Sequence, residues 1–313
     1  MTETLIIGAG LSGLIAARRL QDAGKTVALI DKGRGVGGRL ATRRIGEATL
    51  DHGAQFFTVR GDDFRAVVDD ALAAGVVDVW CHGFDNQDGY PRYYCPKGMT
   101  ALAKWLAEPL DIELGVRATS IAADDTWVIE LESGGRREAD SLIVTSPVPQ
   151  TVDLLDAGHL EVPEALRTLP YKSIVALLVT LDGPSAVPPP GGIQRTEDDL
   201  FTFIADNQQK GVSAIPALTF HVNGAYSSAR YEDPPALVIA DLLKEAAPWI
   251  GSAPIIDVEL KKWRYAAPLE PFEARSLLVT ESPGPLVLAG DAFGGPKVEG
   301  AFNSGAAAAG HLR

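Results

Sequence analysis

The sequence predicts an α/β protein of two domains: a discontinuous domain on a doubly wound, mostly parallel sheet, and a second α+β domain built on a mixed or antiparallel sheet. Three observations predict this fold class. An apolar run at residues 5–7 leads into Gly-x-Gly-x-x-Gly at 8–13 and then into helical spacing of apolar residues. A second apolar run at 27–30 ends in a carboxylate. Much later, residues 285–291 repeat the pattern of a short buried strand before an alanine-rich stretch, so the end of the chain is predicted to complete the first domain.

The segment 8–13 is predicted to be a tight turn between a strand and a helix. Glycine lets the backbone bend sharply and come close to a pyrophosphate, while the helix N-terminus offers unpaired N–H groups to the phosphates. A lone pattern of this kind also serves plain strand-to-helix turns, so the strand and helix around it carry the prediction. The candidate dinucleotide contacts here are Gly8, Gly10, Leu11, Ser12 and Gly13.

Asp31 closes the second apolar run. A carboxylate at this point accepts hydrogen bonds from both hydroxyls of an adenosine ribose and repels a 2′-phosphate. The dinucleotide is therefore predicted to be FAD or NAD rather than NADP, and Asp31 and Lys32 are candidate contacts.

The segment after Asp31 favours a flavin over a nicotinamide nucleotide. Residues 34–55 show no second helix of the kind that a nicotinamide-type half-domain requires. Glycines between Arg34 and Arg39 let a second loop lie against a phosphate, which either arginine can neutralise. The alternative is a flexible surface loop with solvated arginines. Arg34, Gly38 and Arg39 join the candidate FAD contacts.

These motifs, with Asp-His-Gly-Ala-Gln-Phe-Phe at 51–57, resemble the flavin-containing amine oxidase superfamily and, within it, the renalase-like branch. Segments 96–102, 144–150, 262–265 and 288–305 extend the resemblance over nearly the whole chain. The resemblance implies an FAD-binding Rossmann-type domain and a contact between Val116 and the adenine. The FAD is expected to be non-covalent, because monoamine oxidases attach it through a cysteine near the C-terminal FAD segment, whereas both cysteines here lie in the first third of the chain.

Asp291 is predicted to stand at the end of a buried strand. The resemblance implies that it holds a ribityl hydroxyl or the pyrophosphate edge of FAD, and that the helix at 299–309 points its N-terminus at the flavin. A helix N-terminus stabilises the negative charge of a reduced flavin. The other interpretation is a tightly packed Ala/Gly core helix. The candidate FAD contacts of this region are Gly290, Asp291, Glu299, Gly300 and Ala301.

Net charge and composition limit the classes of molecule that this protein is expected to bind. The 313 residues carry a net charge of −13, which argues against nucleic acid or an anionic membrane as a partner. The N-terminus shows no secretory pattern, no apolar run approaches about 18 residues, and the two cysteines are interpreted as reduced. We therefore expect a cytoplasmic protein without a metal site, acting on a small molecule that could itself be a dinucleotide. The oligomeric state stays open.

The remaining patterns place elements in order along the chain. Helices are predicted from about Gly61, from Gly98 and from Pro235 to Trp249. Strands are predicted at 76–80, 90–94, 112–116, 127–132, 141–145, 173–181, 200–204, 217–222, 255–265 and 285–288, with a polar turn at 85–89. The FAD-binding domain is assigned to 1–60, 96–169 and 273–313, and the substrate domain to 61–95 and 170–272.

Candidate catalytic residues follow from what a flavin needs. Oxidation of a hydride donor requires an apolar, stacked platform more than an acid or base. The candidates are His221, Trp263 and Tyr265, with Tyr94, Phe220 and Tyr226 as further aromatic walls. Each aromatic could equally be ordinary core, and His221 a satisfied structural histidine. Lys261 and Lys262 are predicted to face solvent, unlike the lysine that holds a water near the flavin in many amine oxidases.

The resemblance implies an FAD-dependent oxidase that takes hydride from isomeric dihydronicotinamides of NAD(P)H to flavin N5 and passes the electrons to O2, giving H2O2. Two alternatives remain open. One is a small amine oxidase, and the other is a flavin-binding redox sensor with little turnover.

Overall fold

A computed structural model describes residues 2–84 and 88–313, and the chain divides into two compact units. Unit 1 comprises residues 1–38, 102–170 and 267–313, and unit 2 comprises 39–101 and 171–266. The predicted domain division is also discontinuous, but it assigns residues 39–60 to the FAD-binding domain, whereas they pack with unit 2. The functional boundaries between the FAD-binding domain and the substrate domain remain a prediction.

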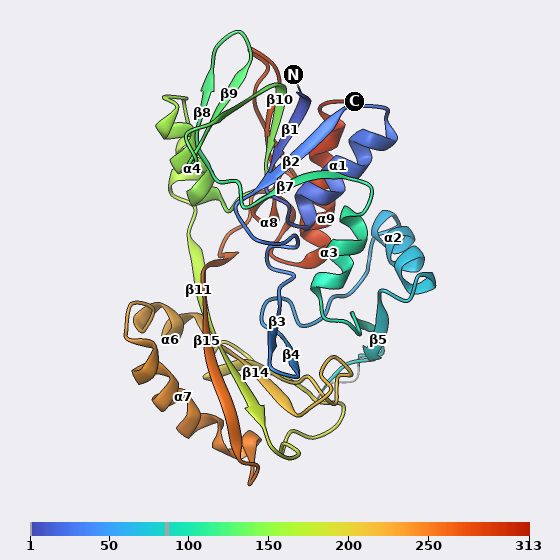
Figure 1. Ribbon diagram of the computed structural model, residues 1–313, viewed down its shortest axis with the longest axis vertical. Helices are drawn as coiled ribbons and strands as arrows, with labels where there is room; N and C mark the ends of the chain where they lie inside the picture. The colour runs from blue at the N-terminus through green and yellow to red at the C-terminus, as the bar shows by residue number, and fades with distance from the viewer. Residues whose placement is uncertain (1, 85–87) are drawn as a thin grey trace. The chain divides into compact units, whose positions relative to one another are not determined.

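Unit 1 is built on an eight-stranded sheet whose central path has the order β16-β17-β10-β1-β2-β7 (Figure 1). The pairs β1–β2, β1–β10, β2–β7 and β10–β17 are parallel. The unit has the predicted Rossmann-type architecture, with an antiparallel extension through β8 and β9. Its strands are β1 (Thr2–Ile7), β2 (Val27–Asp31), β7 (Asp111–Leu114), β8 (Ala118–Ala123), β9 (Trp127–Leu131), β10 (Arg136–Val144), β16 (Leu277–Thr280) and β17 (Leu286–Leu288).

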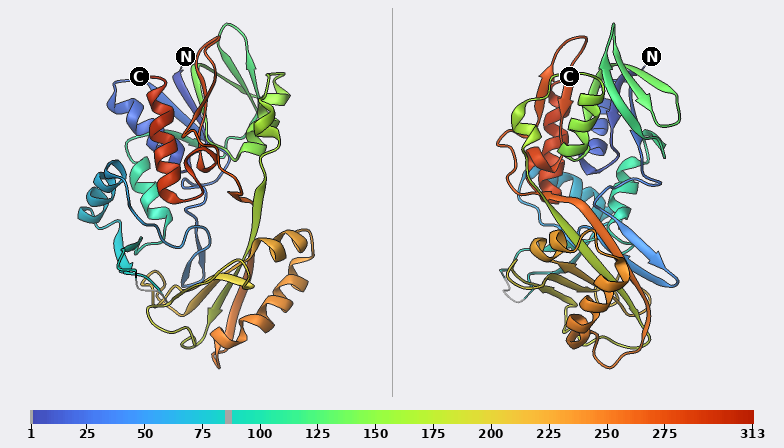
Figure 2. Two further views of the ribbon diagram at one scale, coloured as in Figure 1. Left: turned by 180° about the vertical axis from the view of Figure 1, so that it is seen from behind. Right: turned by 90° about the vertical axis from the view of Figure 1, so that its left-hand side faces the viewer.

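Two helices from opposite ends of the chain lie side by side in unit 1 (Figures 1 and 2). A β-carbon on Gly305 of α9 would lie 2.1 Å from the Ser12 carbonyl oxygen of α1, so the crossing needs glycine. The helices of this unit are α1 (Leu11–Asp22), α3 (Thr100–Ala107, begun in unit 2), α4 (Val148–Ala157), α5 (Glu164–Arg167), α8 (Asp291–Gly294) and α9 (Val298–Gly310).

Unit 2 is built on a five-stranded sheet of order β12-β13-β14-β11-β15, with two hairpins, β3–β4 and β5–β6. The predicted turn at 85–89 lies partly outside the described residues. The strands are β3 (Thr42–Ile45), β4 (Ala48–Asp51), β5 (Asp78–Cys81), β6 (Arg92–Tyr94), β11 (Tyr171–Leu181), β12 (Gly192–Gln194), β13 (Phe201–Asp206), β14 (Ala217–Val222) and β15 (Ile255–Pro268). The helices are α2 (Asp62–Ala73), α6 (Gly224–Ala229) and α7 (Pro235–Ile250).

The two faces of β14 have different partners because successive side chains of a strand point to opposite sides. Leu218, Phe220 and Val222 join a core cluster with α7, whose inward side chains recur at helical spacing. Ala217 instead packs against the β3–β4 hairpin. The face of β14 that carries His221 is therefore the one turned toward the segment around β4.

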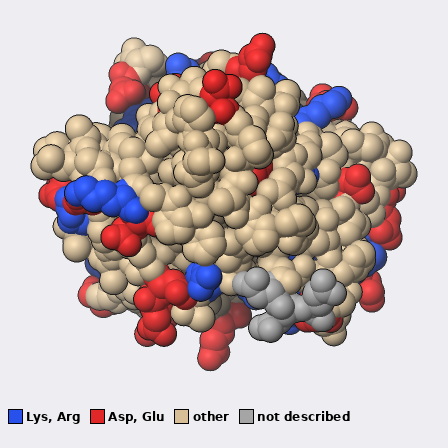
Figure 3. Space-filling view, turned by 90° about the horizontal axis from the view of Figure 1, so that it is seen from below, with Lys and Arg blue, Asp and Glu red and all other residues tan. Residues whose placement is uncertain are grey.

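The predicted helices are confirmed as α2, α3, α7 and α9. Strand β8 and the β3–β4 hairpin were not predicted. Strand β10 begins at Arg136, earlier than the predicted 141–145. The prediction missed this start because the first residues of β10 are charged and do not show the apolar pattern of a strand. No helix among the described residues is long and apolar enough to cross a bilayer. On the face drawn in Figure 3, Lys and Arg groups are interspersed with Asp and Glu groups.

Candidate active site

The glycine-rich turn in unit 1 has the geometry that a dinucleotide phosphate requires. Gly8 has a φ of +112° and donates its N–H to the Ile30 carbonyl at 2.8 Å. A β-carbon on Gly13 would lie 2.0 Å from the Gly8 carbonyl oxygen, while Gly10 faces open space. The backbone can thus turn at 8–13 and be approached closely at Gly10.

The start of α1 favours an anion. Gly10 caps the helix without a side-chain hydrogen bond, and the first turn, with Leu11, Ser12 and Gly13, has no acidic residue. The Ser12 hydroxyl is buried and has no hydrogen-bond partner among the described residues. Unpaired N–H groups with a free hydroxyl beside them suit a pyrophosphate.

Asp31 forms hydrogen bonds to three neighbouring backbone segments. Its carboxylate accepts the Ala9 N–H at 2.7 Å and the Gly33 N–H at 2.6 Å, and its carbonyl accepts the Val116 N–H at 2.9 Å. The predicted adenosine contacts Asp31 and Val116 are thus adjacent. The ribose contact itself remains a prediction.

The second loop lies against the first, and its predicted contact with a phosphate remains a prediction. Gly37 donates its N–H to the Ala9 carbonyl at 2.8 Å, and the position of a β-carbon on Gly38 is 3.5 Å from the Gly10 Cα. Lys32 bonds the Gln150 side chain at 2.7 Å, and Arg34 is exposed. These residues stay candidate FAD contacts.

Arg39 belongs to unit 2, where its guanidinium donates to the carbonyls of Tyr265 and Ala266 at 3.3 and 3.1 Å. A contact of Arg39 with a phosphate therefore remains a prediction.

The C-terminal FAD motif is tightly packed in unit 1. Gly290 has a φ of +129° and donates to the Ser304 hydroxyl at 2.8 Å, which places Asp291 at the start of α8. A β-carbon on Gly294 would lie 1.9 Å from the Gly300 carbonyl oxygen, so Glu299, Gly300 and Ala301 form the first turn of α9 directly beside α8. The interpretation as a tightly packed Ala/Gly helix is confirmed, and the first turn of this helix adjoins α8, whose first residue is Asp291. That the helix points at the flavin remains a prediction.

In unit 2 the structure brings two of the three candidate catalytic residues together at His52. The His52 carbonyl accepts the Trp263 indole N–H at 2.9 Å and a hydrogen bond from the His221 imidazole. The His52 and Trp263 rings are stacked with centroids 5.2 Å apart. Gln55 completes the group, with its Nε2 3.4 Å from His221 Nε2. We call His52, Gln55, His221 and Trp263 the histidine cluster.

Two of the aromatic residues proposed from the sequence lie elsewhere. The ring of Tyr265 packs edge-on against Tyr171, with centroids 5.7 Å apart. The interpretation of Phe220 as a site wall is wrong, because it is fully buried in the core on the α7 face of the sheet.

A buried ion pair beneath the histidine cluster was not predicted. Lys210 Nζ lies 2.8 Å from Asp51 Oδ2, and both side chains have 0% exposure. The other carboxylate oxygen accepts the Thr42 hydroxyl at 2.6 Å and the Met99 N–H at 2.8 Å. The pair therefore fixes the residue that immediately precedes His52.

Burial keeps both histidines of the cluster neutral. Desolvation and, after it, the charge of the neighbouring Lys261 lower the pKa of His52 to about 4. Desolvation likewise lowers the pKa of His221 to about 4, against the hydrogen bond to the His52 carbonyl, which raises it. At neutral pH each ring then has one N–H donor and one acceptor nitrogen.

The free energy of unfolding should fall as the pH is lowered from about 6.5 to about 4. In this window the unfolded chain binds up to two more protons than the folded chain, because the two folded-state pKa values are about 4. Each histidine then costs up to about 1.4 kcal/mol per pH unit, and the loss is complete below the folded pKa. Urea unfolding at pH 7, 6 and 5 should show a smaller pH slope for His221→Asn.

His159→Asn is the matched control, since His159 is exposed and its φ of 61° suits asparagine. An unchanged slope in His221→Asn would contradict the burial of a neutral His221.

The ammonium groups of both lysines of β15, Lys261 and Lys262, have partners within the protein. Lys262 donates to the carbonyls of Tyr231 and Asp233, the latter at 3.1 Å, and Lys261 pairs with Glu259 at 2.5 Å. Lys262 is therefore more buried than predicted. Among the described residues, no group of three or more His, Cys, Asp or Glu side chains could hold a metal ion.

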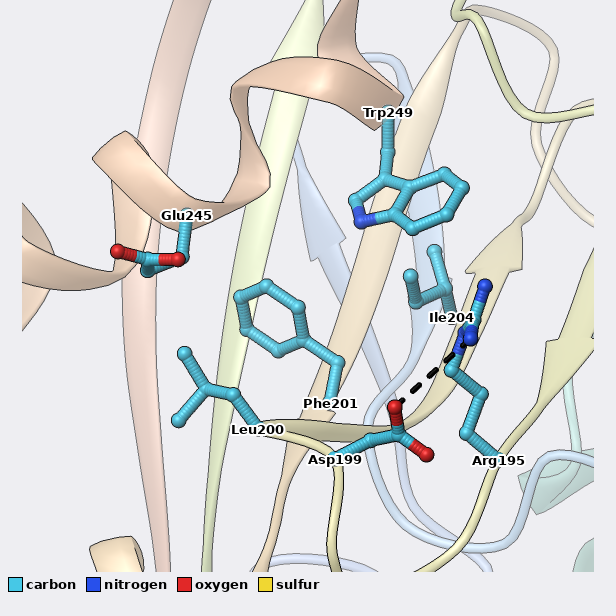
Figure 4. A pocket seen from close by; sticks show the side chains of 7 residues that line it. All are labelled: Arg195, Asp199, Leu200, Phe201, Ile204, Glu245 and Trp249. Atoms are coloured by element: carbon cyan, nitrogen blue, oxygen red, sulfur yellow. Dashed lines mark ion pairs between the residues drawn. The ribbon is translucent and has the colours of Figure 1, made fainter.

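Unit 2 carries a small hollow, which Figure 4 shows. Its walls come from Phe201 and Ile204 of β13 and Trp249 of α7, and Arg195 faces Asp199 at 3.7 Å on its rim. Phe201 and Ile204 belong to the α7-side core, opposite His221. At about 210 Å³ it is smaller than most ligand pockets.

Comparison with family models decides the class of protein. Residues 6–71 match the NAD(P)-binding Rossmann-like domain, and residues 69–313 match the flavin-containing amine oxidoreductases. The chain belongs to the flavin-containing amine oxidoreductase family. It is an FAD-dependent oxidoreductase, and the glycine-rich turn, the uncapped α1 and the close α8–α9 turn fit FAD.

Similar proteins in this family carry different activities in their names. Renalase of Mus musculus is 26% identical over 196 residues, which cover 56% of this chain and 57% of the mouse protein. Putrescine oxidase of Kocuria rosea is 37% identical over 68 residues, which cover 22% of this chain and 14% of that protein. The matched part is thus at most little more than half of these relatives.

Solved structures of the family share the fold along the whole chain. A putative protoporphyrinogen oxidase from Exiguobacterium sp. 255-15 has a TM-score of 0.72 at 15% identity, covering 100% of this chain and 98% of that chain. Putrescine oxidase bound to putrescine has a TM-score of 0.69 at 16% identity, covering 99% and 98%. These similarities establish the fold and leave the substrate open.

Proposed function

We propose that this oxidoreductase is renalase-like and oxidises an isomer of NAD(P)H, whose reacting dihydronicotinamide ring is uncharged. When bound, FAD supplies the acceptor that takes hydride from the dihydropyridine carbon at flavin N5, leaving an aromatic pyridinium, and its two electrons reduce O2 with two protons to H2O2. The resemblance to renalases supports the substrate class. A cytoplasmic location remains part of the proposal.

The candidate FAD contacts of unit 1 would hold the cofactor. The turn at 8–13 and the start of α1 would bind the pyrophosphate, Asp31 and Val116 the adenosine, and Asp291 the ribityl side. The first turn of α9 would place helix N–H groups near the flavin ring.

One observation favours a substrate whose reacting ring is uncharged: the histidine cluster provides no unpaired negative charge among the described residues. Its nearest carboxylate, Asp51, is neutralised by Lys210. The charged groups that act on His52 beyond it are Lys261, Arg43 and Glu259, and Glu259 pairs with both cations. Two cations against one carboxylate disfavour an ammonium group and tolerate a neutral dihydropyridine.

The cluster can orient such a substrate without acid–base chemistry. Trp263 and His52 form a stacked, partly buried pair whose relative position is fixed by the indole hydrogen bond. His221 is neutral and held on a strand, so it can form a hydrogen bond at a fixed place. A hydride donor needs this positioning more than a base.

Two alternative functions, a small amine oxidase and a redox sensor, are also compatible with a flavin site. A small amine oxidase is favoured by the similarity to putrescine oxidase. Lys261 is held by Glu259, and Lys262 by the carbonyls of Tyr231 and Asp233, so each has fewer N–H donors left for a water. A redox sensor with little turnover would use the same flavin site.

Anaerobic stopped-flow mixing of the FAD-loaded protein tests the proposal. Isomeric dihydronicotinamides, primary amines and diamines would be mixed separately, and the flavin absorbance band followed. Fast bleaching by a dihydronicotinamide isomer is expected. Bleaching by an amine alone would favour the amine oxidase, and bleaching by none would favour the sensor; either result overturns the proposal.

A further inference from the structure

We propose that Gln55 recognises the carboxamide of the dihydronicotinamide ring, with His52 as the second acceptor. The inference rests on the proposed function and assigns the groups that would select the substrate. Gln55 lies in the segment 51–57, for which the sequence indicated no individual role beyond the family resemblance.

The orientation of the Gln55 amide is fixed by its neighbours. Nε2 donates to the Asp51 carbonyl at 2.7 Å and approaches the Gly53 carbonyl at 3.3 Å. A flipped amide would place its oxygen against these two carbonyl oxygens, which are acceptors only. The oxygen Oε1 therefore points away from both.

This leaves an acceptor without a protein partner. Gln55 is 5% exposed, and its buried Oε1 has no hydrogen-bond partner among the described residues. His52 Nδ1 is likewise buried and without a partner among them. Buried polar atoms in proteins are nearly always paired, so two such atoms on one short segment indicate a ligand that supplies donors.

The frame behind Gln55 is rigid. The Asp51 carbonyl that accepts its amide also accepts the Thr219 hydroxyl at 2.9 Å, and the Asp51 N–H donates to Asn207 at 3.2 Å. The Asp51 carboxylate is held by Lys210. Gln55 is therefore positioned before any substrate binds, as a recognition group must be.

A primary carboxamide fits these acceptors chemically. Its NH2 group provides two N–H donors in one plane, one for Oε1 and one for a His52 whose proton is on Nε2. An acetyl group has nearly the same shape and no N–H. A site built to accept N–H groups rejects an analogue that lacks them, because its acceptors are then left buried and unpaired.

The experiment compares two substrates that differ only in this group: an isomeric dihydro form of NAD and the same isomer of its 3-acetylpyridine analogue. The wild type should show a kcat/KM for the carboxamide at least about tenfold higher, which corresponds to about 1.4 kcal/mol. Gln55→Met, with similar volume and no polar atoms, should reduce this ratio to near one while keeping bound FAD.

Gln209→Met is the matched control. Gln209 also donates from its Nε2 to a carbonyl of unit 2, that of Val187 at 2.7 Å, but it is exposed and outside the histidine cluster. The substrate ratio should be unchanged in this variant.

The outcomes separate the inference from the proposed function. Reduction of wild-type flavin by both substrates at equal kcat/KM would overturn the role of Gln55 and leave the proposed function standing. An equal loss of both activities in Gln55→Met would also overturn it, since that is the result of a structural role. Reduction by neither substrate would reject the proposed function itself. If Gln55→Met does not fold, Gln55→Leu takes its place, because the acetyl group also changes the hydride-donating power of the ring and the wild-type ratio alone does not isolate Gln55.

Discussion

Lys210→Met should lower the free energy of unfolding by about 3–5 kcal/mol, the cost of leaving one charge of a buried pair uncompensated. Both side chains of the pair with Asp51 have 0% exposure, so water cannot replace the lost ammonium group. The same change should loosen His52 and Gln55, which adjoin Asp51. Urea unfolding of the FAD-loaded protein at pH 7, with tryptophan fluorescence as the signal, measures the loss.

Two further variants make this result specific. Lys244→Met removes a lysine whose side chain is 75% exposed and pairs with Asp241 at 3.3 Å, so it should cost less than about 1 kcal/mol. Adding Asp51→Asn to Lys210→Met should recover part of the loss, because the buried charge is then gone. A loss no larger than that of Lys244→Met, or no recovery in the double variant, would contradict the role given to the pair.

Asp31→Ala should raise the Kd for FAD roughly a hundredfold or more. The carboxylate accepts the N–H groups of Ala9 and Gly33 and is expected to bind the ribose hydroxyls as well. Loss of several hydrogen bonds to a charged acceptor amounts to about 3 kcal/mol or more, and each 1.4 kcal/mol is tenfold in Kd. The ratio of flavin to protein absorbance after dialysis, and titration of the apoprotein with FAD, give the change.

Asp22→Ala is the control for this prediction, because Asp22 is an exposed carboxylate at the end of α1. It should keep full occupancy. Asp31→Asn, which retains one acceptor oxygen, should fall between the two. Full yellow occupancy in Asp31→Ala would remove Asp31 from the cofactor site.

The nucleotide unit could be predicted from the sequence because its signals are local. The glycines of the turn, Gly8, Gly10 and Gly13, lie within six consecutive residues. Only one helix and one strand separate this turn from Asp31, so the spacing of the two motifs is visible in the sequence. The same holds for Gly290 and Asp291, where a strand stops and a helix begins.

The histidine cluster could be predicted only in part, because its contacts join distant segments. Lys210 and Asp51 are 159 residues apart, so no local sequence pattern predicts that they form an ion pair. On β14, five of six residues are buried, so the pattern does not show which face packs on α7. For that reason His221 was identified as a site candidate together with Phe220, its neighbour on the opposite face.

The close crossing of α1 and α9 at Gly305 also constrains the biosynthesis of this enzyme. Helix α1 is synthesised well before α9, whose Gly305 lies against its Ser12 carbonyl. Most of the intervening chain, including all of unit 2, emerges while the first Rossmann strand and helix lack this partner. The packing of α1 against α9 can therefore form only after the whole of unit 2 has been made.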